Sequence, residues 1–498
     1  MLRSISRPAL AFFLAGASGL AACSDSSTGA ITAPAAGAPV RSVAASENGE
    51  YLVRLKGSTA GFQASVEALG GAVSYIHERA GFAVVSGLSA DGATQLAGAS
   101  AVAEVLPNVV MSLGRPQEAV REEMEVGIAS QANPATAIRY SWQWNMKAIN
   151  ADKAWAAGKL GNAGVTVAIL DTGIDYTSLD ARGLVDLSRS VSFIPSDNAI
   201  RAANFPSRHD VDDFNGHGTN VASQVSSTGF AHAGVSSRTT LMGVKVLGAN
   251  GSGSFAAILQ GMLWAADHDA DVINMSLGAA FTKAGGNGQL VGLFNQVLSY
   301  ANRQGEVVVV AAGNESTDLD HNMVPDATGE MQRYPSLYAA FCDATHVICV
   351  SATGPETFGG NPDVPSYYTN FGRSAVTVAG PGGNVGATKS MWPWDNPKGT
   401  GSTVSWVWSM CPRNLLPNPA NPAFRPCASG GVVNAMIGTS QAAPHVAGLA
   451  ALLVAEMGKD KPAQIKARIQ QSAVDAGQPG TDPYFGKGRI DVARALGL

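Results

Sequence analysis

Residues 438–448 read Gly-Thr-Ser-Gln-Ala-Ala-Pro-His-Val-Ala-Gly, and an apolar run follows them to Val454. Small first residues, a proline just inside and the apolar run predict a buried helix that begins near Ser440. Free backbone N–H groups and the positive end of the helix dipole gather at such a start, where they stabilise negative charge. Ser440 is therefore a candidate nucleophile, although serine is also an ordinary helix-capping residue.

Two earlier segments favour the interpretation of Ser440 as a nucleophile. Residues 165–175 read Val-Thr-Val-Ala-Ile-Leu-Asp-Thr-Gly-Ile-Asp, which predicts a buried parallel strand with Asp171 at its carboxyl end, where ligand sites of open α/β sheets lie. In residues 215–222, His217 is flanked by glycines that allow other backbone to approach closely. Acid, base and nucleophile thus occur in the order Asp171, His217, Ser440, which is the order of the subtilisin-type triad.

These segments resemble the subtilisin-like serine protease (subtilase) family. The motifs that match in order are Asp171–Asp175, Gly216–Thr219, Gly243–Leu247, Val272–Gly278, Ala311–Asn314 and Gly438–Gly448. The resemblance covers about residues 142–498. It implies an α/β peptidase domain with a mostly parallel sheet flanked by helices, and hydrolysis of peptide bonds without a cofactor in the chemistry.

The resemblance also implies roles for other residues. The side-chain amide of Asn314, with the backbone N–H of Ser440, would form the oxyanion hole. Two strands would pair with an extended peptide substrate, and small residues would line the main specificity pocket. The implied substrate-binding residues are Gly251, Ser252, Gly253, Ser276, Leu277, Gly278, Ala311, Ala312 and Gly313. His445, one turn along the predicted serine helix, is expected to be structural.

Some charged residues leave alternatives open. Arg333 falls where the family places a pocket-floor residue, and it either points inward or is an outward, solvated arginine, which we favour. Asp180 matches a family calcium ligand, but the loop at 228–234 that should supply further oxygens is short. Acidic clusters at 210–213 and 318–326 either bind a hard cation or lie in solvated loops, the reading we favour. A structural calcium ion therefore stays possible.

The N-terminus predicts export. Arg3 and Arg7 precede an apolar stretch at 9–20 that is too short to span a bilayer comfortably. Leu20-Ala21-Ala22-Cys23 looks like a bacterial lipobox, which implies a signal peptide at 1–22 and a lipid on Cys23; an ordinary secretory signal is the alternative. Residues 23–48, rich in small residues and proline, predict a flexible tether. We expect the protein in the bacterial cell envelope or outside the cell.

Residues 49–113 predict a small α+β domain of β-α-β-β-α-β order, which is the ferredoxin-like arrangement. It resembles the inhibitor pro-domain that precedes subtilase catalytic domains; a permanent accessory domain is the alternative. A docked pro-domain would leave its C-terminal tail in the substrate groove as a product-like inhibitor. The polar segment 114–141 is then the processing junction, and 142–498 the peptidase domain.

The composition limits the classes of partner that we expect the protein to bind. A net charge of −5 with 14% charged residues and no basic run excludes a nucleic-acid partner. We expect a monomer whose partners are peptide substrates, its own pro-domain and, through the lipid, a membrane. Besides Cys23, four cysteines allow three pairings, of which Cys342–Cys349 with Cys411–Cys427 is the simplest. The Gly-, Pro- and Trp-rich insertion at 384–434 either flanks the groove on the leaving-group side or is surface decoration.

These features predict a serine endopeptidase made as a self-processed zymogen. The alternative is a catalytically inactive subtilase fold that binds peptides, against which the four residues Asp171, His217, Asn314 and Ser440 argue. A peptide ligase is a third possibility that no residue marks.

Overall fold

The computed structural model describes residues 49–113, 117–123, 129–282, 288–326, 328–357, 359–384, 405–416 and 432–498. The predicted signal peptide, Cys23 and the tether lie outside the described residues, as do Cys427 and most of the insertion. Within the described ranges, no helix combines the length and apolar character that crossing a membrane needs.

The predicted parallel sheet is present, and every strand pair in it is parallel. Its seven strands run in the order β18-β17-β13-β11-β7-β9-β8. The strands are β7 (Thr166–Asp171), β8 (Val191–Ser192), β9 (Thr240–Lys245), β11 (Val272–Met275), β13 (Val307–Ala311), β17 (Val347–Thr353) and β18 (Val378–Pro381). Their apolar, β-branched sequences fit burial on both faces, and every residue of β7, β11 and β13 is buried.

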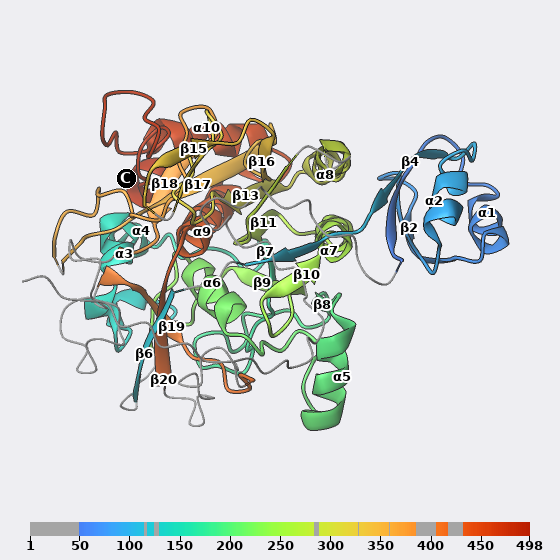
Figure 1. The fold of residues 1–498 in the computed structure, drawn as a ribbon. Helices are drawn as coiled ribbons and strands as arrows, with labels where there is room; N and C mark the ends of the chain where they lie inside the picture. Colours follow the sequence, from blue (N-terminus) through green and yellow to red (C-terminus); the bar gives the residue numbers. More distant parts are fainter. Residues whose placement is uncertain are drawn as a thin grey trace, which may run out of the picture.

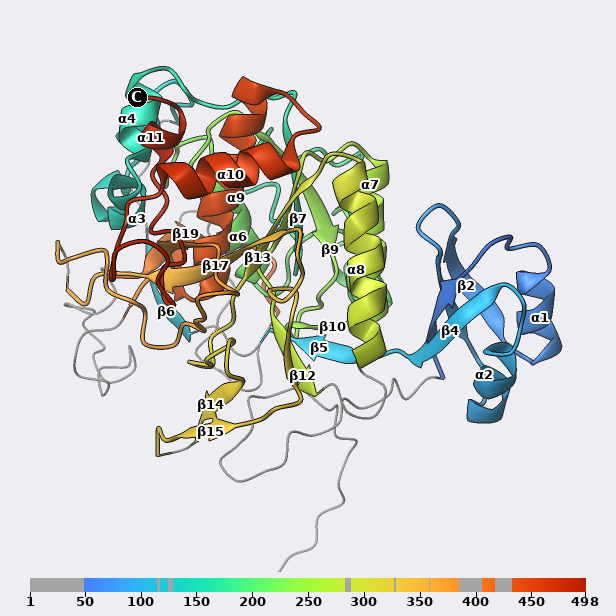
Figure 2. The same ribbon diagram turned by 90° about the horizontal axis from the view of Figure 1, so that it is seen from above.

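Helices cover both faces of this sheet (Figures 1 and 2). Along β7, Val167 and Ile169 pack into one core and Ala168 and Leu170 into the other, because successive strand residues point to opposite faces. The first core holds α6 (His217–Val225), α9 (Thr439–Met457) and α10 (Pro462–Ser472), and the second holds α7 (Phe255–Asp267) and α8 (Gly288–Arg303). Shorter helices are α3 (Trp144–Ala148), α4 (Ala151–Ala156), α5 (Pro195–Asn204) and α11 (Val492–Ala495), with 3-10 turns at Pro134–Thr136 and Tyr140–Trp142.

The N-terminal unit has its own sheet. Its elements are β1 (Tyr51–Leu55), α1 (Phe62–Ala68), β2 (Ala72–His77), β3 (Phe82–Ser86), α2 (Ala90–Leu96) and β4 (Val102–Pro107). The strands pair antiparallel in the order β2-β3-β1-β4. Helices α1 and α2 cover one face, and the other face packs on α7 and α8 through Leu52, Phe82 and Val84 (Figure 2).

In the described residues, four smaller sheets accompany the central sheet and that of the N-terminal unit. Strand β5 (Val110–Ser112) pairs with β10 (Ser252–Ser254), and β6 (Gln117–Glu123) joins β19 (Val407–Met410) and β20 (Val432–Ile437) in a three-stranded sheet. Two further antiparallel pairs are β12 (Ala279–Thr282) with β16 (Leu337–Ala340) and β14 (Met323–Pro325) with β15 (Met331–Arg333).

One predicted disulfide is confirmed, since Cys342 and Cys349 are bonded to each other. Cys411 is also disulfide-bonded, and Cys427, its predicted partner, lies outside the described residues. The closure of the short loop between Cys342 and Cys349 constrains the chain where it enters β17.

A buried carboxyl group lies at the start of β13. Glu306 has no exposed surface, and neither of its carboxylate oxygens has a partner among the described residues. Burial, and then the nearby charges of Asp267, Asp271 and Asp269, raise its pKa to about 9. Glu306 is therefore protonated in the folded protein at neutral pH.

We expect Glu306→Gln to remove a pH dependence of stability. Because the folded pKa is raised, the folded state keeps a proton that the unfolded state loses above its ordinary pKa of 4.5. Stability is therefore full below that pH and falls, by up to ~1.4 kcal/mol per pH unit, until pH passes about 9. Denaturant unfolding of Ser440→Ala with and without Glu306→Gln, from pH 5 to 9, should show curves that diverge as pH rises. Parallel curves would contradict a buried neutral Glu306.

Candidate active site

Asp171 and His217 meet where β7 ends and α6 begins. Asp171 is the last residue of β7 and His217 the first of α6, which packs against that strand. The ring Nδ1 of His217 lies 2.8 Å from Asp171 Oδ1. The same oxygen accepts a bond of 2.7 Å from the backbone N–H of Thr172, which fixes the carboxylate. Both side chains are buried, so the pair is shielded from water.

The glycines beside His217 make this approach possible. Gly216 has a φ of 103°, in the left-handed region that favours glycine. A Cβ at Gly218 would lie 2.1 Å from the carbonyl oxygen of Gly173 and 3.2 Å from the Asp171 Cβ. The expectation that these glycines allow close backbone approach is therefore confirmed.

Ser440 lies at the predicted helix start. It is the second residue of α9, and its Oγ donates a bond of 3.0 Å to the carbonyl oxygen of Ser276. The Ser276 hydroxyl in turn donates to the carbonyl of Ser440 over 2.7 Å. A pocket lined by both His217 and Ser440 opens here. His217 and Ser440 thus line one pocket at the carboxyl edge of the sheet, and Asp171 contacts His217.

Asn314 lines the same pocket. Its Oδ1 accepts bonds of 2.8 and 3.0 Å from the backbone N–H and the hydroxyl of Thr439. With Oδ1 engaged, Nδ2 is the part of the side chain that can donate to a ligand. Asn314 is exposed and lines the pocket, so a substrate oxygen can reach it.

The predicted substrate-binding residues divide into three groups. Gly278, Ala311 and Gly313 line the pocket. Ser276, Leu277 and Ala312 are buried; Ser276 supports Ser440, and the other two pack in the core with α7 and α8. The third group, Gly251, Ser252 and Gly253, already holds a strand of this chain, as follows.

Strand β5 occupies the predicted substrate strand β10. Val110, Met111 and Ser112 pair antiparallel with Ser254, Gly253 and Ser252. Leu113 then donates its backbone N–H to the carbonyl of Gly251 over 2.9 Å, and its side chain lines the pocket beside His217. The segment 110–113 therefore lies as an extended peptide that approaches Ser440.

Sequence reasoning missed Glu315 as a pocket residue. It lines the pocket next to Asn314 and accepts a bond of 2.7 Å from Asn370 Nδ2. Desolvation of its carboxyl raises its pKa, against the bonds from Asn370 and the backbone. Its place directly after Asn314 was the available signal.

Arg333 is exposed on β15 and does not line the pocket, so the favoured outward alternative holds and the inward hypothesis is wrong.

His445 lies in a different environment from His217, as expected. His445 is buried in α9, donates from Nδ1 to the carbonyl of Gln441 over 2.7 Å and accepts from Asn145 Nδ2 over 2.8 Å. Burial lowers its pKa to about 4, so it stays neutral and acts as a structural link between α3 and α9.

Asp180 does not fit a calcium ion. Its Oδ1 accepts bonds from the backbone N–H groups of Phe230 and Ala231 at 3.0 and 2.9 Å, and its Oδ2 accepts from the N–H of His232 at 3.2 Å. Donor groups thus surround the carboxylate where a cation would need further oxygens. The described residues contain no cluster of three His, Cys, Asp or Glu residues that could hold a metal ion.

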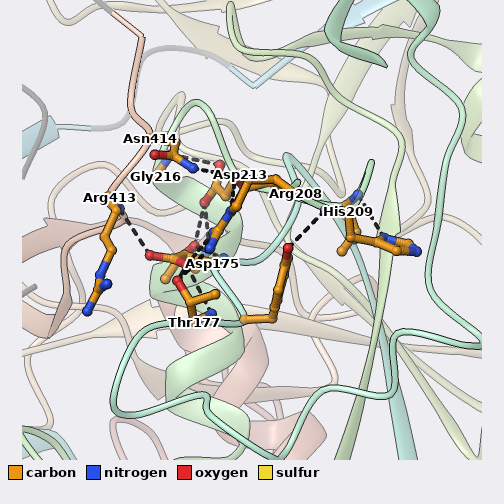
Figure 3. A network of polar contacts seen from close by, with 12 residues as sticks. Asp175, Thr177, Arg208, His209, Asp213, Gly216, Arg413 and Asn414 are labelled. Carbon is orange, nitrogen blue, oxygen red and sulfur yellow. Dashed lines mark hydrogen bonds and ion pairs between the residues drawn. The ribbon is translucent and has the colours of Figure 1, made fainter. Parts of the chain in front are cut away.

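A buried ion network supports the start of α6 (Figure 3). Arg208 binds Asp212 bidentately and donates to Asp175 Oδ1 over 2.7 Å, with both carboxylates fully buried. The insertion closes the network, since the Arg413 N–H donates to Asp175 and Asn414 donates to Asp212. Burial raises the pKa of Asp212, and its bonds to Arg208 oppose that shift. The expectation of a solvated loop is wrong for Asp212 and Asp213, because the fold buries both and pairs Asp212 with Arg208.

Asp213 links this network to His217. Its Oδ1 accepts from the hydroxyl of Thr172 over 2.9 Å and from the backbone N–H of Gly216 over 2.9 Å. The Thr172 hydroxyl accepts in turn from the N–H of Gly218. These bonds connect Thr172 to Gly216 and Gly218, and so fix the position of Asp171 relative to His217.

Known proteins are similar to this chain in sequence. The family model described as "Subtilase family" matches residues 162–488. Thermitase of Thermoactinomyces vulgaris is 28% identical over 359 residues, which are 72% of this chain and 96% of thermitase. Subtilisin DY of Bacillus licheniformis is 30% identical over 352 residues, which are 70% of this chain and 96% of that protein.

Solved structures share the fold as well. The epidermin leader peptide processing serine protease of Staphylococcus aureus has a TM-score of 0.68 at 21% identity, covering 91% of this chain and 98% of its own. Fervidolysin of Fervidobacterium pennivorans has a TM-score of 0.64 at 20% identity, covering 93% and 62%. The chain belongs to the subtilase family, and its class is that of the subtilisin-like serine endopeptidases.

We expect Arg208→Met to destabilise the protein by ~3–5 kcal/mol, because it leaves two buried carboxylates without their cation. Arg201→Met is the matched control: Arg201 binds Asp210, whose side chain is 40% exposed, and its loss should cost at most ~1 kcal/mol. Denaturant unfolding in a Ser440→Ala background measures both. Equal losses for the two variants would contradict the network's role.

Proposed function

We propose that Asp171, His217 and Ser440 act as a catalytic triad that hydrolyses peptide bonds in proteins. The observation that carries the proposal is the 2.8 Å contact between His217 Nδ1 and Asp171 Oδ1, in a pocket that Ser440 also lines. An Nδ1–H that donates to Asp171 leaves Nε2 as the acceptor for the Ser440 proton. The carboxylate then stabilises the imidazolium that forms while Ser440 Oγ attacks the substrate carbonyl.

The proposed oxyanion hole combines two donors. Asn314 Nδ2 is available because Thr439 engages Oδ1, and the backbone N–H of Ser440 lies in the first turn of α9. Amide donors at the start of a long helix stabilise the negative oxygen of the tetrahedral intermediate. The His217 imidazolium returns its proton to the leaving amine, and water repeats the sequence on the acyl-enzyme.

We expect a fluorophosphonate probe to label Ser440 in the mature enzyme and to leave Ser440→Ala unlabelled. Asn314→Ala should keep the label site but lower kcat by about 10²–10³-fold, the loss known for such a donor in subtilisin-type sites. Single-turnover and steady-state kinetics on a peptide substrate measure this. Absence of labelling in mature wild type would favour the inactive, peptide-binding alternative.

The same proposal includes a zymogen. Residues 49–113 have the β-α-β-β-α-β order of ferredoxin-like inhibitor domains, and their tail occupies β10 as a substrate would. Polar contacts also hold the unit on α7 and α8: His77 Nε2 lies 2.7 Å from Asp267 Oδ2, and Gln296 donates to the carbonyl of Gly81 over 3.0 Å. These contacts support an inhibitor docked on its own enzyme.

Self-cleavage is proposed at one of the bonds between Leu113 and Gln117. Leu113 lines the pocket, and Gln117 pairs with Ile437, which lines it too. The connecting residues 114–116 lie outside the described residues, and the described segments before and after them both reach residues of the pocket that Ser440 lines. This interval narrows the predicted junction at 114–141.

N-terminal sequencing should find a new terminus between residues 114 and 117 in wild type, and none in Ser440→Ala. A terminus elsewhere would contradict the proposed interval without touching the triad.

The uncleaved Ser440→Ala chain, recovered from a bacterial envelope, also tests the proposed export and lipid anchor. Its mass should correspond to a chain that begins at a lipid-bearing Cys23, whereas a chain beginning at Met1 would contradict export.

A further inference from the structure

Residues 405–416, a described part of the insertion, contact helix α6 and the loop before it. Strand β19 packs against the helix. Asn220 Nδ2 of α6 donates to Ser409 Oγ over 2.9 Å, and Gln224 Nε2 donates to the carbonyl of Trp408 over 3.0 Å. The helix that begins with the proposed catalytic base is therefore held by a segment far along the chain.

The end of this segment closes over the loop that leads into α6. Asn414 Nδ2 donates to Asp212 Oδ2 over 2.6 Å. The backbone N–H of Leu416 donates to the carbonyl of Phe214 over 3.0 Å. Two hydrogen bonds thus connect the insertion to the residues just before the base, in addition to those that β19 accepts from the helix itself.

The buried acids of this loop need the donors that the insertion supplies. Asp175 and Asp212 have no exposed surface, and both bind Arg208. One guanidinium balances one of two carboxylate charges, so further donors are needed to satisfy the buried oxygens. The insertion gives one to each acid, from the Arg413 N–H and the Asn414 amide. Burial raises the pKa of Asp212, and its bonds to Arg208 and Asn414 oppose that shift.

The position of Asp212 bears on both members of the pair formed by Asp171 and His217. The carbonyl of Val211, its neighbour on one side, accepts from the backbone N–H of Ile174 over 2.9 Å, shortly after the acid. The carboxylate of Asp213, its neighbour on the other side, accepts from the N–H of the residue before the base over 2.9 Å. A displacement of Asp212 would therefore shift backbone that contacts the chain on both sides of the pair.

We propose that residues 405–416 are a positioning element for the catalytic base, and that Asn414 controls the position of His217 through Asp212. The proposal rests on the proposed peptidase function of Ser440. Asn414 does not line the pocket that Ser440 lines, so it is a positioning residue and not a catalytic one. Part of the insertion thus has a role besides the two that the sequence left open.

Asn414→Ala tests the proposal, with Arg413→Ala as the matched control. Figure 3 shows the Arg413 guanidinium pointing away from the network; its backbone N–H binds Asp175, and the control keeps that bond. The mature enzymes are titrated with a fluorophosphonate, so that kcat refers to labelled sites alone. Variants that merely unfold then lose labelled sites without a change in kcat per site.

We expect Asn414→Ala to lower kcat per labelled site on a peptide amide by ~5- to 100-fold, because a displacement of about 1 Å can cost about 10²-fold. KM should stay unchanged, because the substrate strand β10 is untouched. The rate at which the probe labels Ser440 should fall in parallel with kcat, since His217 takes the serine proton in both reactions. Arg413→Ala should leave all three quantities unchanged.

A double-mutant cycle tests the route through Asp212. Asp212→Asn removes the charge that the Asn414 amide serves, so the further change Asn414→Ala should lower kcat per labelled site no more. The same factor in the Asp212→Asn background as in wild type would overturn the route through Asp212.

The remaining outcomes separate this proposal from the peptidase function. Equal kcat per labelled site for wild type and Asn414→Ala, with Ser440 labelled in both, would overturn the positioning role alone. A similar loss in Arg413→Ala would also overturn it, because that variant keeps the hydrogen bonds to both acids. Failure of labelling in mature wild type would instead remove the proposed function on which the positioning role rests.

Discussion

Packing of α9 against the parallel sheet is the constraint on which the site depends. Every residue of this helix from Thr439 to Val454 is buried, and it contacts β7, β11, β13, β17 and β18 as well as α6. The apolar sequence after Ser440 drives that burial, because each large side chain removed from water contributes about 1.5–3 kcal/mol. With the helix so fixed, its first turn can lie only at the carboxyl edge of the sheet, beside the ends of β7 and β13.

This arrangement explains why much of the site could be predicted. Asp171, Asn314 and Ser440 each sit at an element end that a local pattern marks: an apolar strand that stops at an acid, a strand followed by small residues, and a helix that starts with small residues. Parallel strands share one carboxyl edge, so residues far apart in sequence are brought together by topology alone. The glycines around His217 signalled a close approach that the structure contains.

Other features depend on contacts that no local pattern encodes. Whether Asp212 lies in solvent or in a buried network is decided by Arg208 and by Asn414 in the insertion, some 200 residues along the chain. The pairing of β6 with β20 joins segments more than 300 residues apart, and the polar sequence of β6 gives no strand signal. Arg333 was expected near a pocket floor as one alternative, but its segment pairs with β14 in a separate two-stranded sheet, where Arg333 is exposed.

The hydrogen bonds that Asp180 accepts bear on how this fold is stabilised. A bound ion stabilises a fold only in proportion to the logarithm of its free concentration, so its contribution vanishes when the medium is depleted. Three amide groups of the loop at 230–232 supply the positive ends of dipoles to this carboxylate instead. Because those donors are part of the chain, dilution or a chelator cannot remove them. At Asp180, the carboxylate is held by groups of the chain itself.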